Sequence, residues 1–134
     1  MIQNKVVVHY LDGKIIKGQT IDFLPTKPTF HVSLIDAPPN TPPLEINISG
    51  VKAIFFVKDY VGNSKREEIL GFSVDKPAIG RKIKVTFRDG EVLVGTTQGY
   101  DASRPGFFII PADPDSNNDR CFIVASATRQ VSFI

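Results

Sequence analysis

The chain has 134 residues, of which 42% are hydrophobic, enough apolar material for one ordinary core or two small ones. Its net charge is only +2, whereas non-specific nucleic-acid binders are usually more basic because phosphate neutralisation supplies most of their affinity. A single cysteine excludes an internal disulfide, and no apolar run approaches the length that spans a membrane. The N-terminus lacks a signal-peptide pattern, so we expect a cytoplasmic protein.

One hairpin pattern occurs twice. In residues 5–18 and again in residues 82–95, an Asp-Gly pair separates two runs rich in β-branched residues. Asp and Gly tolerate positive φ, so the pattern predicts a β-hairpin with a two-residue type I′ turn. The similarity continues without a gap, at an offset of 77 residues, until Phe56 aligns with Phe133. A register held over this length predicts a tandem duplication.

The duplication divides the chain into a first half (residues 1–60), a connector (residues 61–78) and a second half (residues 79–134). The connector carries Ile69, Leu70, Phe72 and Val74, so we expect it to dock on the rest of the protein. Alternating or β-branched runs predict strands near residues 5–11, 15–23, 29–35, 44–48, 53–57, 82–88, 92–100, 106–110, 121–125 and 130–134. A single helical turn is expected at residues 49–52, and a bulge or bend at Gly18.

This plan predicts an all-β fold. Each half would have short strands with one tight turn before the last, which indicates two tandem homologous small β-barrels of the SH3-like or Sm-like kind. Closing each barrel would remove the sheet edges that an open arrangement exposes.

Several segments resemble a bacterial family of unknown function. The resemblance rests on an Asp-Gly-x-x-x-x-Gly pattern in both halves, and on the segments at residues 20–23, 27–31, 51–60, 95–100, 105–108 and 111–118. It covers nearly the whole chain. It implies a bacterial origin and brings no assigned activity.

A more distant likeness is to Sm-like RNA-binding proteins. The second half supplies the two glycines, the aromatic residue and the Asp of their first motif, as Gly90, Gly95, Tyr100 and Asp101. Pro105 stands where those proteins place the Asn that helps to bind a base. The likeness therefore implies the fold more than RNA binding, and a nucleic-acid-binding Sm-like module is the alternative function.

Residues suited to catalysis are few. His9 and His31 each lie in a predicted strand, and Thr86 and Phe108 take their places in the other half. Both histidines are therefore interpreted as structural or surface residues. Cys121 has no adjacent His or Lys to lower its pKa and is interpreted as a small core residue. We expect no enzymatic activity and no cofactor.

The loop from Asp113 to Asp119 places oxygen-bearing side chains at alternate positions, as a calcium-binding loop does. Asn118 replaces the Gly that a sharp EF-hand turn needs, and Val124 stands where the bidentate Glu belongs. Short polar residues are also the ordinary composition of a turn. We expect no metal site, and the sequence leaves cation binding by this loop open.

The two halves differ on the outer face of their first and last strands. Lys84 and Ser132 in the second half correspond to Val7 and Phe55 in the first half. Four residues of the first half, Val7, Leu11, Phe55 and Val57, are therefore predicted to form an apolar patch outside the barrel. We expect this patch to be covered by the connector, by the second half or by a second subunit.

From these features the sequence predicts a non-catalytic binding or regulatory module that acts through protein–protein contacts. A protein partner or self-association is expected, and no membrane contact.

Overall fold

A computed structural model describes residues 4–58, 80–101, 103–112 and 118–134. The described strands are β1 Asn4–Tyr10, β2 Ile15–Thr20, β3 Thr29–Leu34, β4 Leu44–Asn47, β5 Val51–Val57, β6 Arg81–Phe87, β7 Val92–Thr97, β8 Gly106–Pro111, β9 Asn118–Val124 and β10 Thr128–Phe133. A 3₁₀ turn, η1 (Ala125–Ala127), precedes β10, and there is no α-helix in these ranges. The all-β prediction is confirmed. The expected docking of residues 61–78 lies outside the described residues.

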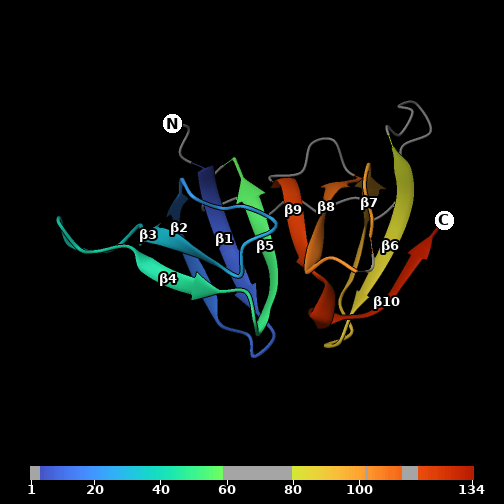
Figure 1. Cartoon of the computed structure of the whole chain (residues 1–134), viewed down its shortest axis with the longest axis horizontal. Coiled ribbons are helices and arrows are strands. Elements are labelled where there is room, and N and C mark those ends of the chain that lie inside the picture. Colours follow the sequence, from blue (N-terminus) through green and yellow to red (C-terminus); the bar gives the residue numbers. More distant parts are fainter. Residues whose placement is uncertain (1–3, 59–79, 102, 113–117) are drawn as a thin grey trace, which may run out of the picture.

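All ten strands belong to one antiparallel sheet in the order β10-β6-β7-β8-β9-β5-β1-β2-β3-β4 (Figure 1). Each half contributes a continuous block, in which its fifth strand is followed by its first, second, third and fourth. Four of the five pairs of corresponding strands begin 77 residues apart, as Asn4 of β1 and Arg81 of β6 illustrate, whereas β9 begins at Asn118, three residues before the counterpart of Leu44 in β4. The two blocks meet where β5 pairs with β9.

The sheet is open, so the expected closed barrels are not what the described strands form. Closing the first half would require β5 to pair with β4 of the same half. Instead β5 has β1 on one side and β9 of the other half on the other. A strand has only two hydrogen-bonding edges, so both edges of β5 are used. Strands β4 and β10 remain at the two ends of the sheet.

The hairpin turns also differ from the prediction. Asp12 and Asp89 keep negative φ, and only Gly13 (φ +94°) and Gly90 (φ +93°) enter the left-handed region. In the first hairpin the Tyr10 carbonyl accepts the Gly13 N–H, and the Tyr10 N–H donates to Lys14. This is a three-residue loop that ends in a left-handed Gly, not a two-residue type I′ turn. The aspartate accepts the N–H two residues later, which fits this loop.

Other predicted elements also differ from the structure, and the strand expected at residues 92–100, β7, ends at Thr97. The second strand ends at Thr20 instead of residue 23, because Asp22 turns back to accept the His31 N–H. The expected helical turn at residues 49–52 is a tight turn at Gly50 (φ +87°). In the second half Ala127 takes the place of Gly50, and the chain forms η1 there.

The core is continuous across the two halves. Buried apolar side chains of both halves form one cluster, with Val6, Val8 and Ile54 inside the first half and Ile83 and Val85 inside the second. A continuous core explains how two units of marginal size stabilise each other. It also fixes the position of the surfaces described next.

Candidate interaction surfaces

The β5–β9 junction sets the faces of the central sheet. Phe55 lies opposite Cys121 on β9 and opposite Val7 on β1, whereas Ile54 lies opposite Phe122 and Val8. Directly opposed residues point to the same side of a sheet. Val7 and Phe55 therefore point away from the face that carries Val8 and Ile54, and they share their own face with β9 of the second half.

The four residues of the expected patch occupy different places. Val7, Phe55 and Val57 are buried, with 8%, 7% and 8% of their surface exposed. Phe55 also contacts the His9 ring edge-on, at 4.6 Å between ring centroids. Leu11 lies beyond β1 in the hairpin loop and is half-buried against the core. The structure thus brings Val7 and Phe55 together at the junction and leaves Leu11 at the far end of β1.

The opposite face of the junction is aromatic. Phe23 of the first half packs edge-on against Phe122 and Phe108 of the second half, at 5.0 and 6.0 Å between ring centroids. The Arg120 guanidinium lies 4.4 Å from the ring centre of Phe56 and 4.8 Å from that of Phe108. Sequence reasoning missed this cluster. Phe23 and Phe56 have the aromatic counterparts Tyr100 and Phe133, which supported the alignment of the halves but did not reveal the contact between them.

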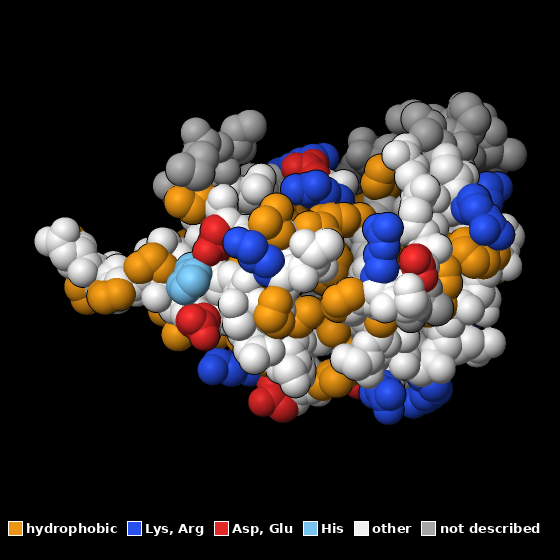
Figure 2. All heavy atoms as spheres, viewed as in Figure 1, with side chains coloured by type: hydrophobic (Ala, Val, Ile, Leu, Met, Phe, Trp, Pro, Cys, Tyr) orange, Lys and Arg blue, Asp and Glu red, His pale blue; other side chains and the backbone are white. Residues whose placement is uncertain are grey.

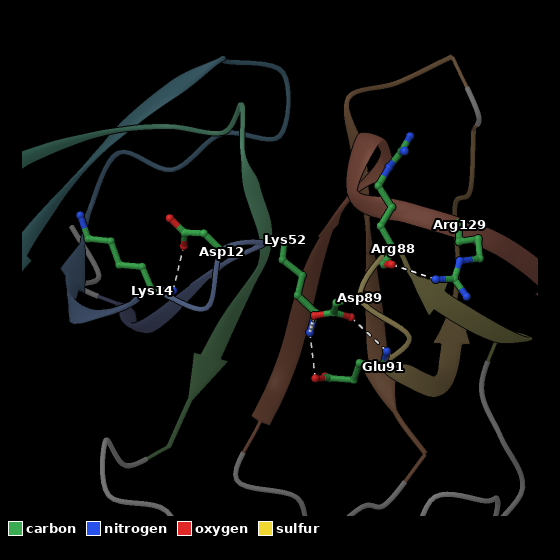
Figure 3. Close-up of polar contacts among 7 residues, drawn as sticks. All are labelled: Asp12, Lys14, Lys52, Arg88, Asp89, Glu91 and Arg129. Carbon is green, nitrogen blue, oxygen red and sulfur yellow. Dashed lines mark hydrogen bonds and ion pairs between the residues drawn. The ribbon is translucent and has the colours of Figure 1, made fainter.

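A buried lysine connects the halves beside this junction. Lys52 on β5 points at the hairpin between β6 and β7, where its Nζ lies 2.8 Å from both Asp89 Oδ2 and Glu91 Oε2 (Figure 3). The Lys52 side chain is only 5% exposed, and its Nζ lies 4.8 Å from the Phe87 ring centre. Burial alone would lower the pKa of Lys52, but the hydrogen bonds to the two carboxylates outweigh burial and raise it. The hydrogen bond from Lys52, the largest influence, lowers the pKa of Asp89.

The two histidines lie in different surroundings. Burial beside Phe55 lowers the pKa of His9, which favours its neutral form. His31 lies on the surface of the first half, with Nδ1 2.7 Å from Asp22 Oδ2 and Nε2 3.7 Å from Glu45 Oε2. Figure 2 shows that acidic, basic and hydrophobic side chains are interspersed on one face of the molecule. In the described ranges no group of three metal-binding side chains is arranged to hold an ion.

An open hollow lies against β2 and β3. It has a volume of about 810 Å³ and is lined by Ile15, Ile16, Lys17, Leu34, Ile35, Asp36, Ala37, Pro38 and Thr41, and we call it the β2–β3 hollow. The loop after β3, which extends beyond the sheet in Figure 1, forms one wall. Hydrogen bonds from Thr41 to the Pro38 carbonyl hold the tip of this loop.

Three large apolar side chains around the β2–β3 hollow are exposed to solvent. Ile15, Leu34 and Ile35 are 51%, 40% and 44% exposed. In the second half the corresponding positions hold Val92, Pro111 and Ala112, so the two halves differ here as well. The sequence analysis did not single out these positions, because an isolated exposed Ile or Leu is ordinary and only the folded loop gathers the three.

Cys121 is buried in β9, as expected of a small core residue. Three cationic residues, Lys82, Lys84 and Arg88, are exposed along β6 and the turn after it. Residues 113–117 of the candidate cation loop lie outside the described part of the chain. At the end of that loop, Asp119 lies 3.9 Å from the Lys58 ammonium.

Comparison with known proteins identifies a family. The model of a family of unknown function, DUF6982, matches residues 2–134. The chain belongs to DUF6982. No curated protein and no solved structure matches this DUF6982 chain. In the ranges described for it, no helix is long and apolar enough to cross a membrane. Family membership covers both halves and the connector, and it carries no activity with it.

Proposed function

We propose that this protein is a non-catalytic binding or regulatory module that acts through protein–protein contacts, and that the β2–β3 hollow receives an apolar segment of its partner. The observation that carries the proposal is the exposure of Ile15, Leu34 and Ile35 around one preformed hollow. Apolar side chains gathered in this way on a protein surface are characteristic of interaction sites. In this role we place the protein in the bacterial cytoplasm.

The chemistry of the lining favours an uncharged partner segment. Lys17 and Asp36 contribute one charge of each sign, and the other lining side chains are uncharged. The Ile35 N–H donates to the Lys17 carbonyl, so the loop wall is attached to β2 before any partner arrives. A preformed wall reduces the entropy that binding must spend on ordering the site.

The test is a binding comparison between two corresponding positions. A tagged chain is used to capture its partner from cells that express it, and the affinity for the purified partner is then measured. Ile15→Ser should weaken binding about tenfold or more, because burying such a side chain contributes roughly 1.5–3 kcal/mol. Val92→Ser alters the equivalent position of the second half and should leave the affinity unchanged. Equal losses from both variants would contradict the assignment of the hollow.

A nucleic-acid-binding Sm-like module is the second candidate. Two observations favour it. Each half keeps its last strand beside its first, as SH3-like and Sm-like barrels do. Lys82, Lys84 and Arg88 also present cationic groups along β6 and the turn after it. Under this alternative, single-stranded RNA should bind with an affinity that falls steeply as salt rises, and Lys84→Ala should reduce that slope.

A further inference from the structure

We propose that the protein self-associates head to tail, with β10 of one chain pairing with β4 of the next in the register that joins β5 to β9 within the chain. The outer edges of β10 and β4 are separate from the β2–β3 hollow, and the proposal does not depend on what that hollow binds. The proposal starts from the sheet order. The fifth strand of the first half pairs with the fourth strand of the second, and the fifth and fourth strands that remain, β10 and β4, end the sheet.

The outer edges of these strands have no partner among the described strands. Shifting the β5–β9 register by 77 residues places Val131 opposite Glu45 of the next chain and Ser132 opposite Leu44 of the next chain. All four positions lie inside strands. A free strand edge is a template for such pairing, because its N–H and C=O groups are already aligned.

Side chains that the junction buries have exposed counterparts at the two edges. Phe56 is 4% exposed, but its counterpart Phe133 is 40% exposed. Cys121 is 1% exposed, but its counterpart Leu44 is 39% exposed. Ile134, the final residue, is 60% exposed. An added strand at each edge would cover this apolar surface, as the junction covers its equivalent.

One aromatic contact of the β5–β9 junction has a counterpart at β10. Tyr100 packs on Phe133 at 5.7 Å between ring centroids, and Phe23 packs on Phe56 at 5.6 Å. On Phe56 the cation comes from the other half, as Arg120. On Phe133 it comes from the same half, as Arg81, at 3.7 Å from the ring centre. The β10 edge thus carries its own cation.

The approaching strand has the opposite charge. Glu45 of β4 stands where β9 carries Phe122, so the strand brings a carboxylate to the side of the sheet where Arg81 lies. A second pair follows from the lysine contact. Arg129 corresponds to Lys52 and Asp12 to Asp89, so Arg129 would meet the exposed Asp12 of the next chain. Figure 3 shows that Arg129 now donates to the Arg88 carbonyl of its own chain.

Other replacements limit the strength of the contact. Pro43 stands where β9 has Arg120, and it offers no N–H, so the new ladder would end at Leu44. Lys14 stands where the second carboxylate, Glu91, lies, so only one of two ion pairs recurs. We therefore expect reversible association that grows with concentration. Because the two surfaces differ, the contact is heterologous and builds a ring or an open chain of protomers.

The test uses two variants, each of which disables one edge. Phe133→Asp disables β10 and Leu44→Asp disables β4, and sedimentation velocity measures the mass of each at increasing concentration. The wild-type mass should rise with concentration, while each variant alone should stay monomeric. An equal mixture of the two should give a species of two chains, because one intact β10 edge and one intact β4 edge remain.

Controls separate this result from misfolding and from other contacts. Ile110→Asp changes a side chain that is 48% exposed on β8, a strand with a neighbour on each side, and should associate like the wild type. Arg129→Glu should weaken association, and adding Asp12→Arg should restore it. A wild-type chain that stays monomeric would overturn the proposal. So would association of either single variant alone, or a mixture that remains monomeric.

Discussion

At the scale of single residues, Lys52 illustrates how a buried charge is tolerated. Its ammonium has two carboxylate partners on the neighbouring half and an aromatic ring beneath it. Removing a partner from a buried ion leaves a charge without compensation, which costs more than replacing the ion by an apolar side chain of similar volume. The Lys52 cluster should therefore respond unequally to changes on its two sides.

We expect Asp89→Asn combined with Glu91→Gln to lower the free energy of unfolding by about 3 kcal/mol, because Lys52 is then buried without an anion. Lys52→Met should cost less than about 1.5 kcal/mol, since it replaces the buried ion by an apolar side chain of similar volume and leaves two carboxylates that water can solvate. Urea denaturation measures both. Asp12→Asn is the matched control, because Asp12 Oδ1 accepts the Lys14 N–H of its own hairpin.

The same cluster gives a pH dependence of defined sign. The folded-state pKa of Asp89 is lowered, so its stabilisation is complete above the ordinary value of 3.8 and is lost as pH falls through the folded-state value. Unfolding followed from neutral to strongly acidic pH should show this loss in the wild type and a flatter curve in Lys52→Met. Parallel curves would contradict the assigned role of Lys52.

At the scale of elements, the hairpins show how far local sequence reasoning reaches. Asp-Gly between β-branched runs located both hairpins and aligned them. It did not determine the loop length, because Asp-Gly also fits a three-residue loop in which Gly alone is left-handed. The pairing of Tyr10 with Lys14 decides between the two, and it depends on the register of the whole hairpin.

Gly18 marks the close crossing of β2 and β3. A Cβ built there would overlap the Ser33 carbonyl oxygen and the Val32 side chain, so the position has a steric need for Gly. The pairing of β1 with β2 runs through Gly18 without a register shift, so no bulge of that ladder lies there. Gly18→Ala should therefore lower stability by about 1–3 kcal/mol, measured by thermal or urea unfolding. Gly99→Ala is the control, because a Cβ there meets no atom within 4 Å. An unchanged stability for Gly18→Ala would show that the strands separate easily.

At the scale of the whole molecule, the sequence predicted the recurrence of strands but not the way in which the halves join. Strand boundaries follow from local alternation and came within a few residues of the structure. The β5–β9 pairing depends on residues far apart in the chain, and nothing near Phe55 specifies Cys121 as its neighbour. The aromatic cluster around Phe23 and the β2–β3 hollow could not be predicted for the same reason, because strands and loops that are distant in sequence build them.

The difference between the halves leads to a prediction about the junction. Phe55→Ser gives the first half the residue that the second half has at this position, Ser132. It should lower the free energy of unfolding by at least about 3 kcal/mol, because the buried ring leaves a cavity between Val7 and Cys121. Lys84→Ser, on an exposed position of β6, should change stability by less than about 0.5 kcal/mol. Similar effects of the two in calorimetry would contradict the junction role of Phe55.

The order of the strands also affects how the protein is made. Synthesis proceeds from the N-terminus, so β5 leaves the ribosome before β6, β7, β8 and finally β9. Until β9 arrives, the nascent chain carries an unpaired strand edge that includes Phe55 and Phe56. An apolar edge in that state can pair with another nascent chain, and pairing across a long sequence separation is slow. The interval between β5 and β9 is therefore the stage of biosynthesis at which this protein most needs protection from aggregation.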